Sequence, residues 1–297
     1  MTTNERTPSV VERFVGTLSR FRAGYRSATF RTIEPKLKEI ATPNGVLRFA
    51  LSSEIEEWRA TSLLSKEAGT VAWIGRSVHA GDIFYDIGAN IGIYSLMAAQ
   101  RVGETGKVYS FEPHLLNCAS LLRNIASNNF VNRITPLCVA LHNDEQLLPF
   151  NYYSLVPGAS MSQLNRLEDG DNRPFDAAAV ELKQATSIDR LIASGHLQPP
   201  TYVKIDVDGN EPLILSGMKN LLASAQAPRE VQVEVNAGCV ALIEEIMRDS
   251  AYDRIERHDT AAGLEQLRRG TPPEAVAHNL IYRRSMQHPA TAGKNHE

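Results

Sequence analysis

Short apolar runs alternate with longer amphipathic segments along most of the chain, and this alternation predicts strands and helices in turn. The apolar runs predict strands at 83–86, 108–111, 134–141, 202–208 and 230–236. Apolar positions at helical spacing predict helices at 91–98, 114–127, 187–192, 211–222 and 240–250. In the second helix we expect a buried face made of Leu115, Leu116, Ala119, Leu122 and Ile125. The alternation indicates an α/β fold with a mostly parallel sheet and helices on both faces, closed by a hairpin of strands at 255–257 and 278–283.

The first 42 residues are expected to form an N-terminal helical extension, separate from a main domain at 43–285. Apolar side chains recur there at helical spacing, with arginines between them, at Val11, Phe14, Val15, Leu18, Phe21 and Tyr25. Such a basic amphipathic helix packs against the main domain or a second subunit, which leaves a homodimer open, or lies on an anionic surface. The polar residues 286–297 are expected to be a disordered tail.

Residues 142–185 interrupt the alternation and are expected to form an insertion near the active face. Extended runs at 147–153 and 179–184 predict added antiparallel strands, and the polar residues 154–178 between them predict a mobile lid. Plausible lining residues for an acceptor pocket in this region are Tyr152, Tyr153, Ser160, Met161 and Ser162.

The stretch 81–99 predicts a strand, a glycine-rich turn and a helix, which together form half of a nucleotide-binding unit. Gly88, Ala89, Asn90 and Gly92 make the turn, where a ligand can approach the backbone closely. Asp86 precedes the turn and would repel a pyrophosphate, so it favours a ligand with positive charge such as S-adenosylmethionine.

Four further residues follow predicted strands and are expected to converge with Asp86 on one crevice. An acid at the end of the second strand, Glu112 of the pair Glu112-Pro113, is placed to accept hydrogen bonds from ribose hydroxyls. Leu141, Asp206 and Asn236 lie at or just beyond the predicted ends of the third, fourth and fifth strands.

Composition narrows the classes of function. The chain has 297 residues, an apolar fraction of 43% and a net charge of −3, which argues against general nucleic-acid binding. Its three cysteines show no metal or redox spacing, and no apolar run is long enough to span a membrane. The start of the chain lacks the pattern of a signal peptide, so we expect a cytoplasmic protein.

Four motifs resemble the FkbM-type S-adenosylmethionine-dependent methyltransferases: YDIGANIGIYSL, FEP, VAL-x-N and KIDVDGNEPLILSG, within about residues 45–285. The resemblance implies a class I methyltransferase (Rossmann-like) fold with a seven-stranded sheet and one antiparallel strand. It also implies O-methylation of a hydroxyl on a sugar or natural product. Cofactor contacts carried over to the matching positions are Asp86, Gly88, Ala89, Asn90, Gly92, Glu112, Pro113, Ala140, Leu141 and Asp206. Asp208 stands where members commonly have Glu, and the N-terminal 40 residues lie outside the resemblance.

Methyl transfer to a hydroxyl needs close positioning and a base that takes the proton. The catalytic candidates are Lys204, Asp206, Asp208 and Glu211. On a strand, Lys204, Asp206 and Asp208 would share one face, and Lys204 would keep Asp206 ionised. The same residues could instead be a buried ion pair that orders the fourth strand.

Several alternatives stay open at this stage. A divalent metal could be held by the oxygen ligands Asp206, Asp208, Glu211 and Glu234, although we expect none, and His114 and His142 are secondary candidates for the crevice. A non-catalytic S-adenosylmethionine-binding subunit would keep the fold without the chemistry. A nicotinamide-dependent oxidoreductase is disfavoured because the sequence lacks G-x-G-x-x-G.

Overall fold

The computed structural model describes residues 35–168, 173–235, 238–273 and 276–285. The predicted basic helix, the polar tail and Asn236 lie outside these residues. Residues 36–42, which we assigned to the helical extension, form strand β1 (Lys36–Thr42) instead. This strand pairs antiparallel with β2 (Gly45–Leu51), whose Leu47, Phe49 and Leu51 are buried in the main core. The main domain therefore begins before residue 43.

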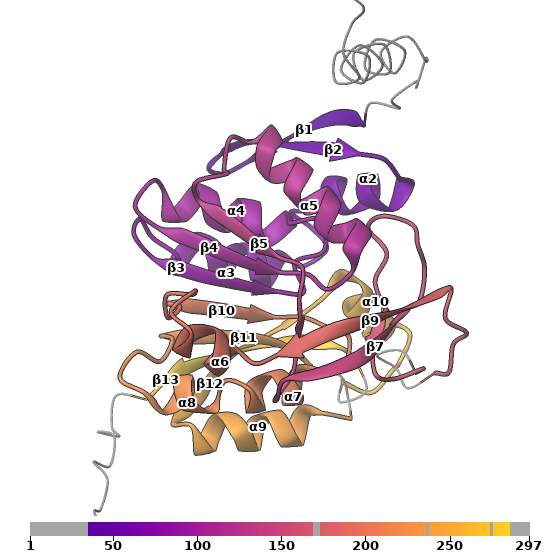
Figure 1. The fold of residues 1–297 in the computed structure, drawn as a ribbon. Coiled ribbons are helices and arrows are strands. Elements are labelled where there is room, and N and C mark those ends of the chain that lie inside the picture. Colours follow the sequence, from indigo (N-terminus) through magenta and orange to yellow (C-terminus); the bar gives the residue numbers. More distant parts are fainter. Residues whose placement is uncertain (1–34, 169–172, 236–237, 274–275, 286–297) are drawn as a thin grey trace, which may run out of the picture. The chain divides into compact units, whose positions relative to one another are not determined.

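A seven-stranded sheet forms the centre of the domain, in the order β12-β13-β11-β10-β3-β4-β5 (Figure 1). Its strands are β3 (Ile83–Ile87), β4 (Lys107–Phe111), β5 (Ile134–Leu137), β10 (Tyr202–Ile205), β11 (Glu230–Val235), β12 (Tyr252–Asp259) and β13 (His278–Arg284). Only β13 runs antiparallel to its neighbours, and the pairs from β11 to β5 are parallel. The predicted sheet with one antiparallel strand and the closing hairpin are confirmed.

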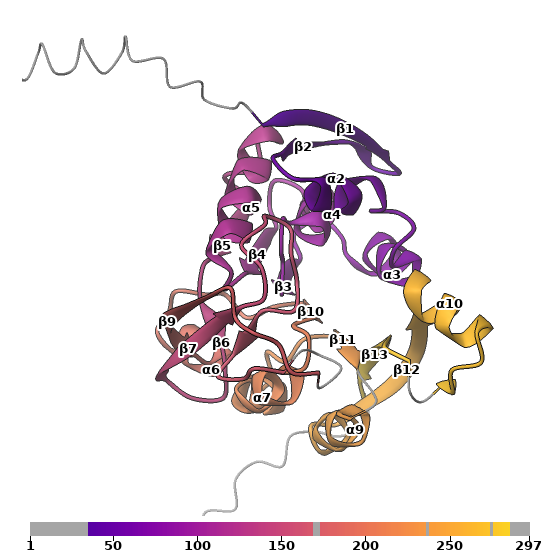
Figure 2. The same cartoon turned by 90° about the vertical axis from the view of Figure 1, so that its right-hand side faces the viewer.

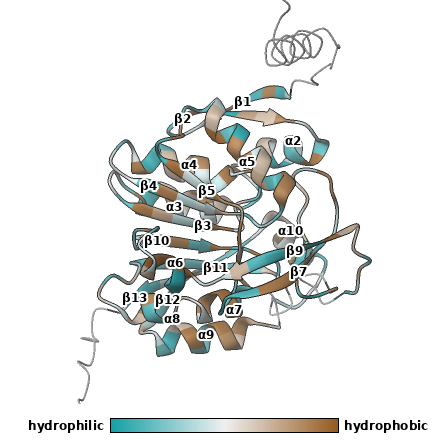
Figure 3. Cartoon of the chain, viewed as in Figure 1, coloured by the Kyte–Doolittle hydropathy of each residue, from teal (hydrophilic) through white to brown (hydrophobic). Residues whose placement is uncertain are grey.

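Helices cover both faces of the sheet, as the alternation predicted (Figure 2). One core lies under α3 (Ala68–Ser77), α4 (Ile93–Val102) and α5 (Leu115–Ser127). The other lies under α6 (Ile188–Ala193), α7 (Glu211–Ser216), α8 (Lys219–Ala223) and α9 (Val240–Asp249). Helix α9 carries both hydrophobic and hydrophilic residues (Figure 3), and it buries Ile243 and Met247 against the sheet. Helices α2 (Glu54–Thr61) and α10 (Ala261–Arg268) complete the domain.

Helix α5 turns a face to the core that differs in part from the one we expected, although Ile125 is buried as predicted. Leu115 and Leu122 are 55% and 54% exposed, whereas Asn117 and Asn124 are buried. Asn124 accepts a hydrogen bond from Ala50 N and donates one to a backbone carbonyl of the glycine-turn segment. The buried face therefore combines the apolar Leu121 and Ile125 with asparagines that form hydrogen bonds to the backbone.

The insertion at 142–185 contributes to a second, four-stranded sheet in the order β6-β9-β7-β8. Its members are β6 (Ala140–Leu141), β7 (Gln146–Tyr152), β8 (Gln163–Leu164) and β9 (Ala179–Thr186), and the β7–β9 pair is antiparallel as predicted. The strand expected at 134–141 is divided, because β5 belongs to the central sheet and β6 to the added one.

Candidate active site at the carboxyl ends of the strands

A cavity of about 220 Å³ lies where β3, β4, β10 and β11 end. The side chains that face it from these strand ends include those of Asn90, Glu112, Asp206 and Asp208, joined by Glu234. A smaller cavity of about 40 Å³ adjoins it and shares Gly88, Pro113 and Phe150 with it. The smaller cavity has a largely apolar lining that includes Phe111, Val139, Ala140 and Leu141.

The turn after β3 has a backbone conformation that few residues other than glycine adopt. Gly88 has φ +82°, and a Cβ atom there would lie 1.7 Å from the carbonyl oxygen of Asp206. Gly92, with φ +89°, is the N-cap of α4. The amides of Gly88 and Ala89 both donate to the Phe111 carbonyl, which fixes the turn against β4. Ala89 and Gly92 shape the turn but line neither cavity.

Asp86 lies behind the turn rather than in the cavity. Its side chain is fully buried, and its Oδ2 accepts a hydrogen bond of 2.5 Å from the Ser95 hydroxyl. Burial raises the pKa of Asp86, against the opposing effect of the Lys204 charge. Among the described residues its Oδ1 has no hydrogen-bond partner. Any effect of Asp86 on a ligand is therefore electrostatic and acts through the turn.

Glu112 follows β4 and faces the cavity, as predicted. Its two carboxylate oxygens accept hydrogen bonds from the backbone amides of Asn90 and His114, at 2.7 and 2.8 Å. Burial raises the pKa of Glu112 to about 7, although both hydrogen bonds act in the opposite direction.

His114 is the N-cap of α5, where its Nδ1 accepts from Asn117 N and its Nε2 donates to the Ser154 carbonyl. It also lines the cavity, whereas His142 does not. Burial lowers the pKa of His114, which favours the neutral imidazole. With both ring nitrogens engaged by the chain, His114 holds the site together and is not available as a base.

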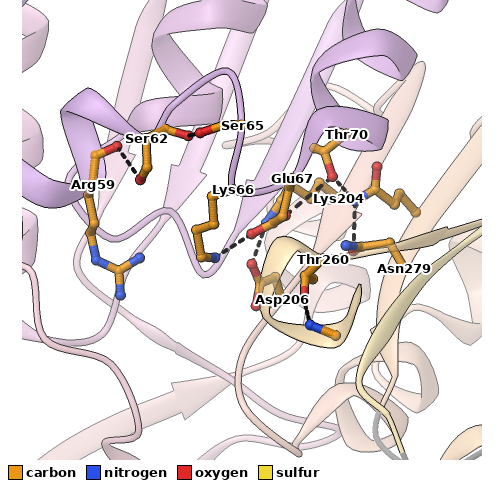
Figure 4. A network of polar contacts seen from close by, with 12 residues as sticks. Arg59, Ser62, Ser65, Lys66, Glu67, Thr70, Lys204, Asp206, Thr260 and Asn279 are labelled. Carbon is orange, nitrogen blue, oxygen red and sulfur yellow. Dashed lines mark hydrogen bonds and ion pairs between the residues drawn. The ribbon is translucent and has the colours of Figure 1, made fainter. Parts of the chain in front are cut away.

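Lys204 and Asp206 form an ion pair at the floor of the cavity (Figure 4). Lys204 is 1% exposed, and its Nζ lies 2.8 Å from Asp206 Oδ2 and 4.8 Å from the centre of the Tyr94 ring. Burial alone would lower the pKa of Lys204, but the charges of Asp206, Glu67 and Asp86 raise it. The predicted ion pair is thus present, and its lysine lies outside the reach of solvent.

Asp206 shares a hydrogen bond with Glu234, which extends from the neighbouring strand β11. Burial would raise the pKa of Asp206, but Lys204 and Lys66 hold it below its ordinary value. Burial and the charge of Asp206 raise the pKa of Glu234 well above its ordinary value. Two carboxyl groups in contact cannot both ionise easily, and the charges of Lys204 and Lys66 favour the ionised form of Asp206.

The prediction that Asp208 shares a strand face with Lys204 and Asp206 is wrong. Strand β10 ends at Ile205, and Asp208 has φ +60° in the following loop. Asp208 still lines the cavity, and its Oδ2 accepts from Met161 N at 2.8 Å. Burial, followed by the charge of Asp206, raises its pKa.

Glu211 organises the loop after β10 and lines neither cavity. Its Oε1 accepts from the amides of Val207 and Gly209, at 3.2 and 3.0 Å. Burial raises the pKa of Glu211 to about 7, against those backbone hydrogen bonds. The structure therefore gives Glu211 a structural contact, and its predicted catalytic role stays a prediction.

Residues 157–163, here called the strap, cross the cavity and are tied to it by hydrogen bonds. Gly158 N donates to Asn117, and the side-chain amides of Asn90 and Asn117 donate to the Ala159 carbonyl. Ser160, Met161 and Ser162 line the cavity as predicted, whereas Tyr152 and Tyr153 do not. These hydrogen bonds hold the strap in place and do not support the predicted movement of this part of the lid. Residues 169–172 of the predicted lid lie outside the described part.

Several cavity residues come from α2 and the loop after it, where we predicted none. Trp58 and Arg59 face the cavity from α2, and Lys66 faces it from the loop. Lys66 forms an ion pair with the buried Glu67, which also accepts from the Thr70 hydroxyl (Figure 4). The capping box of Ser53 and Glu56 marks the helix in the sequence, but no local signal marks its cationic side chains.

Within the described ranges, no group of three His, Cys, Asp or Glu side chains is arranged to hold a metal ion. The same part of the chain contains no helix with the length and apolar character needed to cross a membrane. The three cysteines, Cys118, Cys138 and Cys239, are partly exposed.

The two cavities together suit a particular ligand chemistry. The small cavity offers an apolar lining against which part of a flat ring can pack, and the Glu112 carboxylate can accept hydrogen bonds from hydroxyls beside it. The carboxylates after β10 favour a cationic group nearby. Gly88 leaves room where a Cβ atom would collide with the chain itself. An adenosine joined to a positively charged side chain fits this set of donors, acceptors and spaces.

Known proteins are similar to this chain over most of the domain. Residues 86–253 match the family model described as the methyltransferase FkbM domain. The hexuronic acid methyltransferase AglP of Haloferax volcanii is 26% identical over 191 residues, which are 64% of this chain and 71% of that protein. The 31-O-demethyl-FK506 methyltransferase FkbM of Streptomyces tacrolimicus is 26% identical over 216 residues, or 64% of this chain and 80% of that protein.

A crystal structure of a methyltransferase FkbM from Methylobacillus flagellatus is 17% identical to this chain, with a TM-score of 0.47. The alignment covers 78% of this chain and 56% of that one. The match to the family model spans more than half of the sequence and includes the glycine turn, Glu112 and the loop after β10. The chain therefore belongs to the FkbM methyltransferase family, and its cofactor is S-adenosylmethionine.

Proposed function

We propose that this protein transfers a methyl group from S-adenosylmethionine to a hydroxyl oxygen of a sugar or a natural product. The observation that carries the proposal is the Asp206 carboxylate, which faces the cavity and is kept ionised by the buried Lys204. An ionised carboxylate beside the cofactor cavity can accept a hydrogen bond from the acceptor hydroxyl. It can take the proton as the new bond from oxygen to the methyl group forms, because the hydroxyl then becomes strongly acidic.

The residues divide into a cofactor half and an acceptor half. The turn from Gly88 to Asn90, the Glu112 carboxylate and the apolar cavity hold the cofactor, which when bound supplies an electrophilic methyl group on a sulfonium. Asp206 orients the acceptor hydroxyl and takes its proton, while Glu234 donates a hydrogen bond to the same carboxylate. Lys204 keeps Asp206 charged before the reaction and stabilises its position throughout.

The named relatives support oxygen as the acceptor atom. One relative is named a 31-O-demethyl-FK506 methyltransferase, and another is named for hexuronic acid. The exposed indole of Trp58 at the cavity supports a ring-shaped acceptor, because a tryptophan face packs well against the C–H face of a sugar. The acceptor lies, in this proposal, between Trp58 and the strap.

The test is a methyl-transfer assay with labelled S-adenosylmethionine and a panel of hexuronic acids, neutral sugars and hydroxylated natural products. Asp206→Asn should lower turnover of any accepted substrate by about 10²- to 10⁴-fold, the usual contribution of a general base. Its affinity for S-adenosylhomocysteine should stay near that of the wild type. Its melting temperature should fall, because Lys204 loses its buried counter-charge, so turnover is compared at a temperature where both proteins are folded. Asp249→Asn, which changes an exposed carboxylate on α9, is the matched control.

Three results would count against the proposal. Full turnover by Asp206→Asn would exclude this residue as the base. Loss of turnover on adding a chelator would favour the metal-dependent alternative. Binding of S-adenosylhomocysteine without turnover of any acceptor class would favour a non-catalytic subunit, whereas the family match already disfavours a nicotinamide-dependent oxidoreductase.

A further inference from the structure

Arg59 is a cation in the cavity that has no carboxylate partner within the described part of the chain. The cavity is lined by two long basic side chains, those of Arg59 and Lys66. Lys66 is already paired with Glu67. The Arg59 guanidinium forms no ion pair among the described residues, and its Nε donates to the Gly158 carbonyl at 2.5 Å. Its terminal nitrogens, Nη1 and Nη2, are therefore available to a ligand.

The chain holds this guanidinium in a defined place. Helix α2 begins with the capping box of Ser53 and Glu56, and the Ser53 hydroxyl also donates to the Pro157 carbonyl at 2.6 Å. A Cβ atom on Gly158 would lie 3.0 Å from Glu56 N, so the strap packs closely on the start of α2. The bond from Arg59 Nε to Gly158 then fixes the plane of the guanidinium. Figure 4 shows its terminal nitrogens extending away from α2 without a partner among the residues drawn.

The guanidinium lies on the side of the cavity that belongs to the glycine turn. The Asn90 side-chain amide donates to the Ala159 carbonyl, one residue along the strap from the carbonyl that Arg59 contacts. The charge of Arg59 also lowers the pKa of both Glu112 and Asp208, although burial is the larger influence on each and raises it. Arg59 is thus within electrostatic reach of acids on both sides of the cavity.

The charges of the cofactor can be matched to these groups. S-adenosylmethionine carries a sulfonium and an ammonium, which suit the carboxylates of the cavity, and one carboxylate, which needs a donor. We propose that Arg59 binds the α-carboxylate of the cofactor through Nη1 and Nη2. An arginine offers two parallel donors that match a carboxylate, and this pairing is stronger than a neutral hydrogen bond. The assignment rests on the proposed function only in placing the cofactor in this cavity.

Calorimetry with two ligands isolates the predicted contact. S-adenosylhomocysteine has the α-carboxylate, whereas 5′-methylthioadenosine has the same adenosine and thioether without the amino acid. Arg59→Met should weaken binding of S-adenosylhomocysteine by about 10- to 100-fold, the range of a hydrogen bond to a charged group. Its affinity for 5′-methylthioadenosine should stay within about twofold of the wild type, because this ligand has no carboxylate for Arg59 to bind.

Two further variants serve as controls. Arg59→Lys keeps a charge without the paired donors and should lose an intermediate amount of affinity for S-adenosylhomocysteine. Arg101→Met removes an arginine whose Nε also donates to a backbone carbonyl, that of Val78, but which does not line the cavity. It should leave both affinities unchanged.

Equal weakening of both ligands in Arg59→Met would overturn the assignment, because it would mean that Arg59 only supports the strap. Unchanged affinity for both ligands would overturn it as well and would leave the guanidinium to an anionic group of the acceptor. A wild-type protein that binds neither ligand would refute the cofactor site itself, so the two failures are distinguishable.

Discussion

Replacing Lys204 by Met should destabilise the protein strongly, because it leaves a buried carboxylate without its main counter-charge. Lys204 is 1% exposed, and its Nζ lies 2.8 Å from Asp206 Oδ2. Removing one member of a buried ion pair typically costs about 3–5 kcal/mol of unfolding free energy. Lys66 partly compensates for the loss, since its charge also lowers the pKa of Asp206. We therefore expect a loss near the lower end, about 3 kcal/mol at pH 8.

The loss should depend on pH in a direction that follows from the ion pair. In the wild type the pKa of Asp206 is lowered, so its stabilising contribution is present above its ordinary pKa of about 4 and is lost as the pH falls. In Lys204→Met the opposing effect of burial is no longer balanced, and the pKa of Asp206 rises. The carboxylate then takes up a proton at a higher pH. The difference in stability between variant and wild type should be larger at pH 8 than at pH 5.

Urea unfolding followed by tryptophan fluorescence measures both effects. The double variant Lys204→Met with Asp206→Asn should be more stable than Lys204→Met alone at pH 8, because the unpaired charge is gone. Lys219→Met, on the exposed side of α8, controls for the loss of a lysine in general. A loss below about 1 kcal/mol, or an equal loss at both pH values, would refute the reasoning, since either result means that Lys204 does not govern the charge of Asp206.

Two further predictions test the turn and the loop that frame the site. Gly88→Ala should lower the affinity for S-adenosylhomocysteine by more than tenfold in calorimetry, because its Cβ would lie 1.7 Å from the Asp206 carbonyl oxygen, whereas Gly75→Ala meets no atom within 4 Å and should have no effect. Glu211→Gln should gain unfolding free energy relative to the wild type as the pH rises from 4.5 to 7, by up to about 3 kcal/mol. The reason is that the raised pKa of Glu211 makes its ionisation costly in the folded wild type. Urea unfolding at several pH values measures this change, and a constant difference would show that Glu211 is ionised without cost.

The parts of the site that could be predicted are those in which function and local structure share a few consecutive residues. The glycine turn is one example, because the conformation that lets a ligand approach also requires glycine at residue 88. Glu112 is another, since the end of a parallel strand fixes where the next side chain lies. Each of these could be placed from the order of strands alone, without knowledge of any long-range contact.

The side of the cavity formed by α2 and the loops could not be predicted in this way, because its residues meet only through tertiary contacts. Arg59 and Lys66 lie far in sequence from the loop after β10, yet all of them line one cavity. The position of Asp208 depends on where β10 ends, and the apolar alternation continues past that point to Val207. The loop forms because Glu211 draws the amides of Val207 and Gly209 toward its carboxylate, a contact that periodicity does not reveal.

Helix α5 shows why the misassigned face matters for function. Its buried Asn117 binds the backbone of the strap at Gly158 and Ala159, and its buried Asn124 binds the backbone of β2 and of the glycine turn. These polar contacts leave Leu115 and Leu122 toward the solvent, which an apolar core alone would not do. Helix α5 thus fixes the position of the strap relative to the glycine turn. Because the strap also supplies Ser160 to Ser162, we expect changes in its side chains to alter the proposed acceptor pocket while its backbone contacts to Asn90 and Asn117 remain.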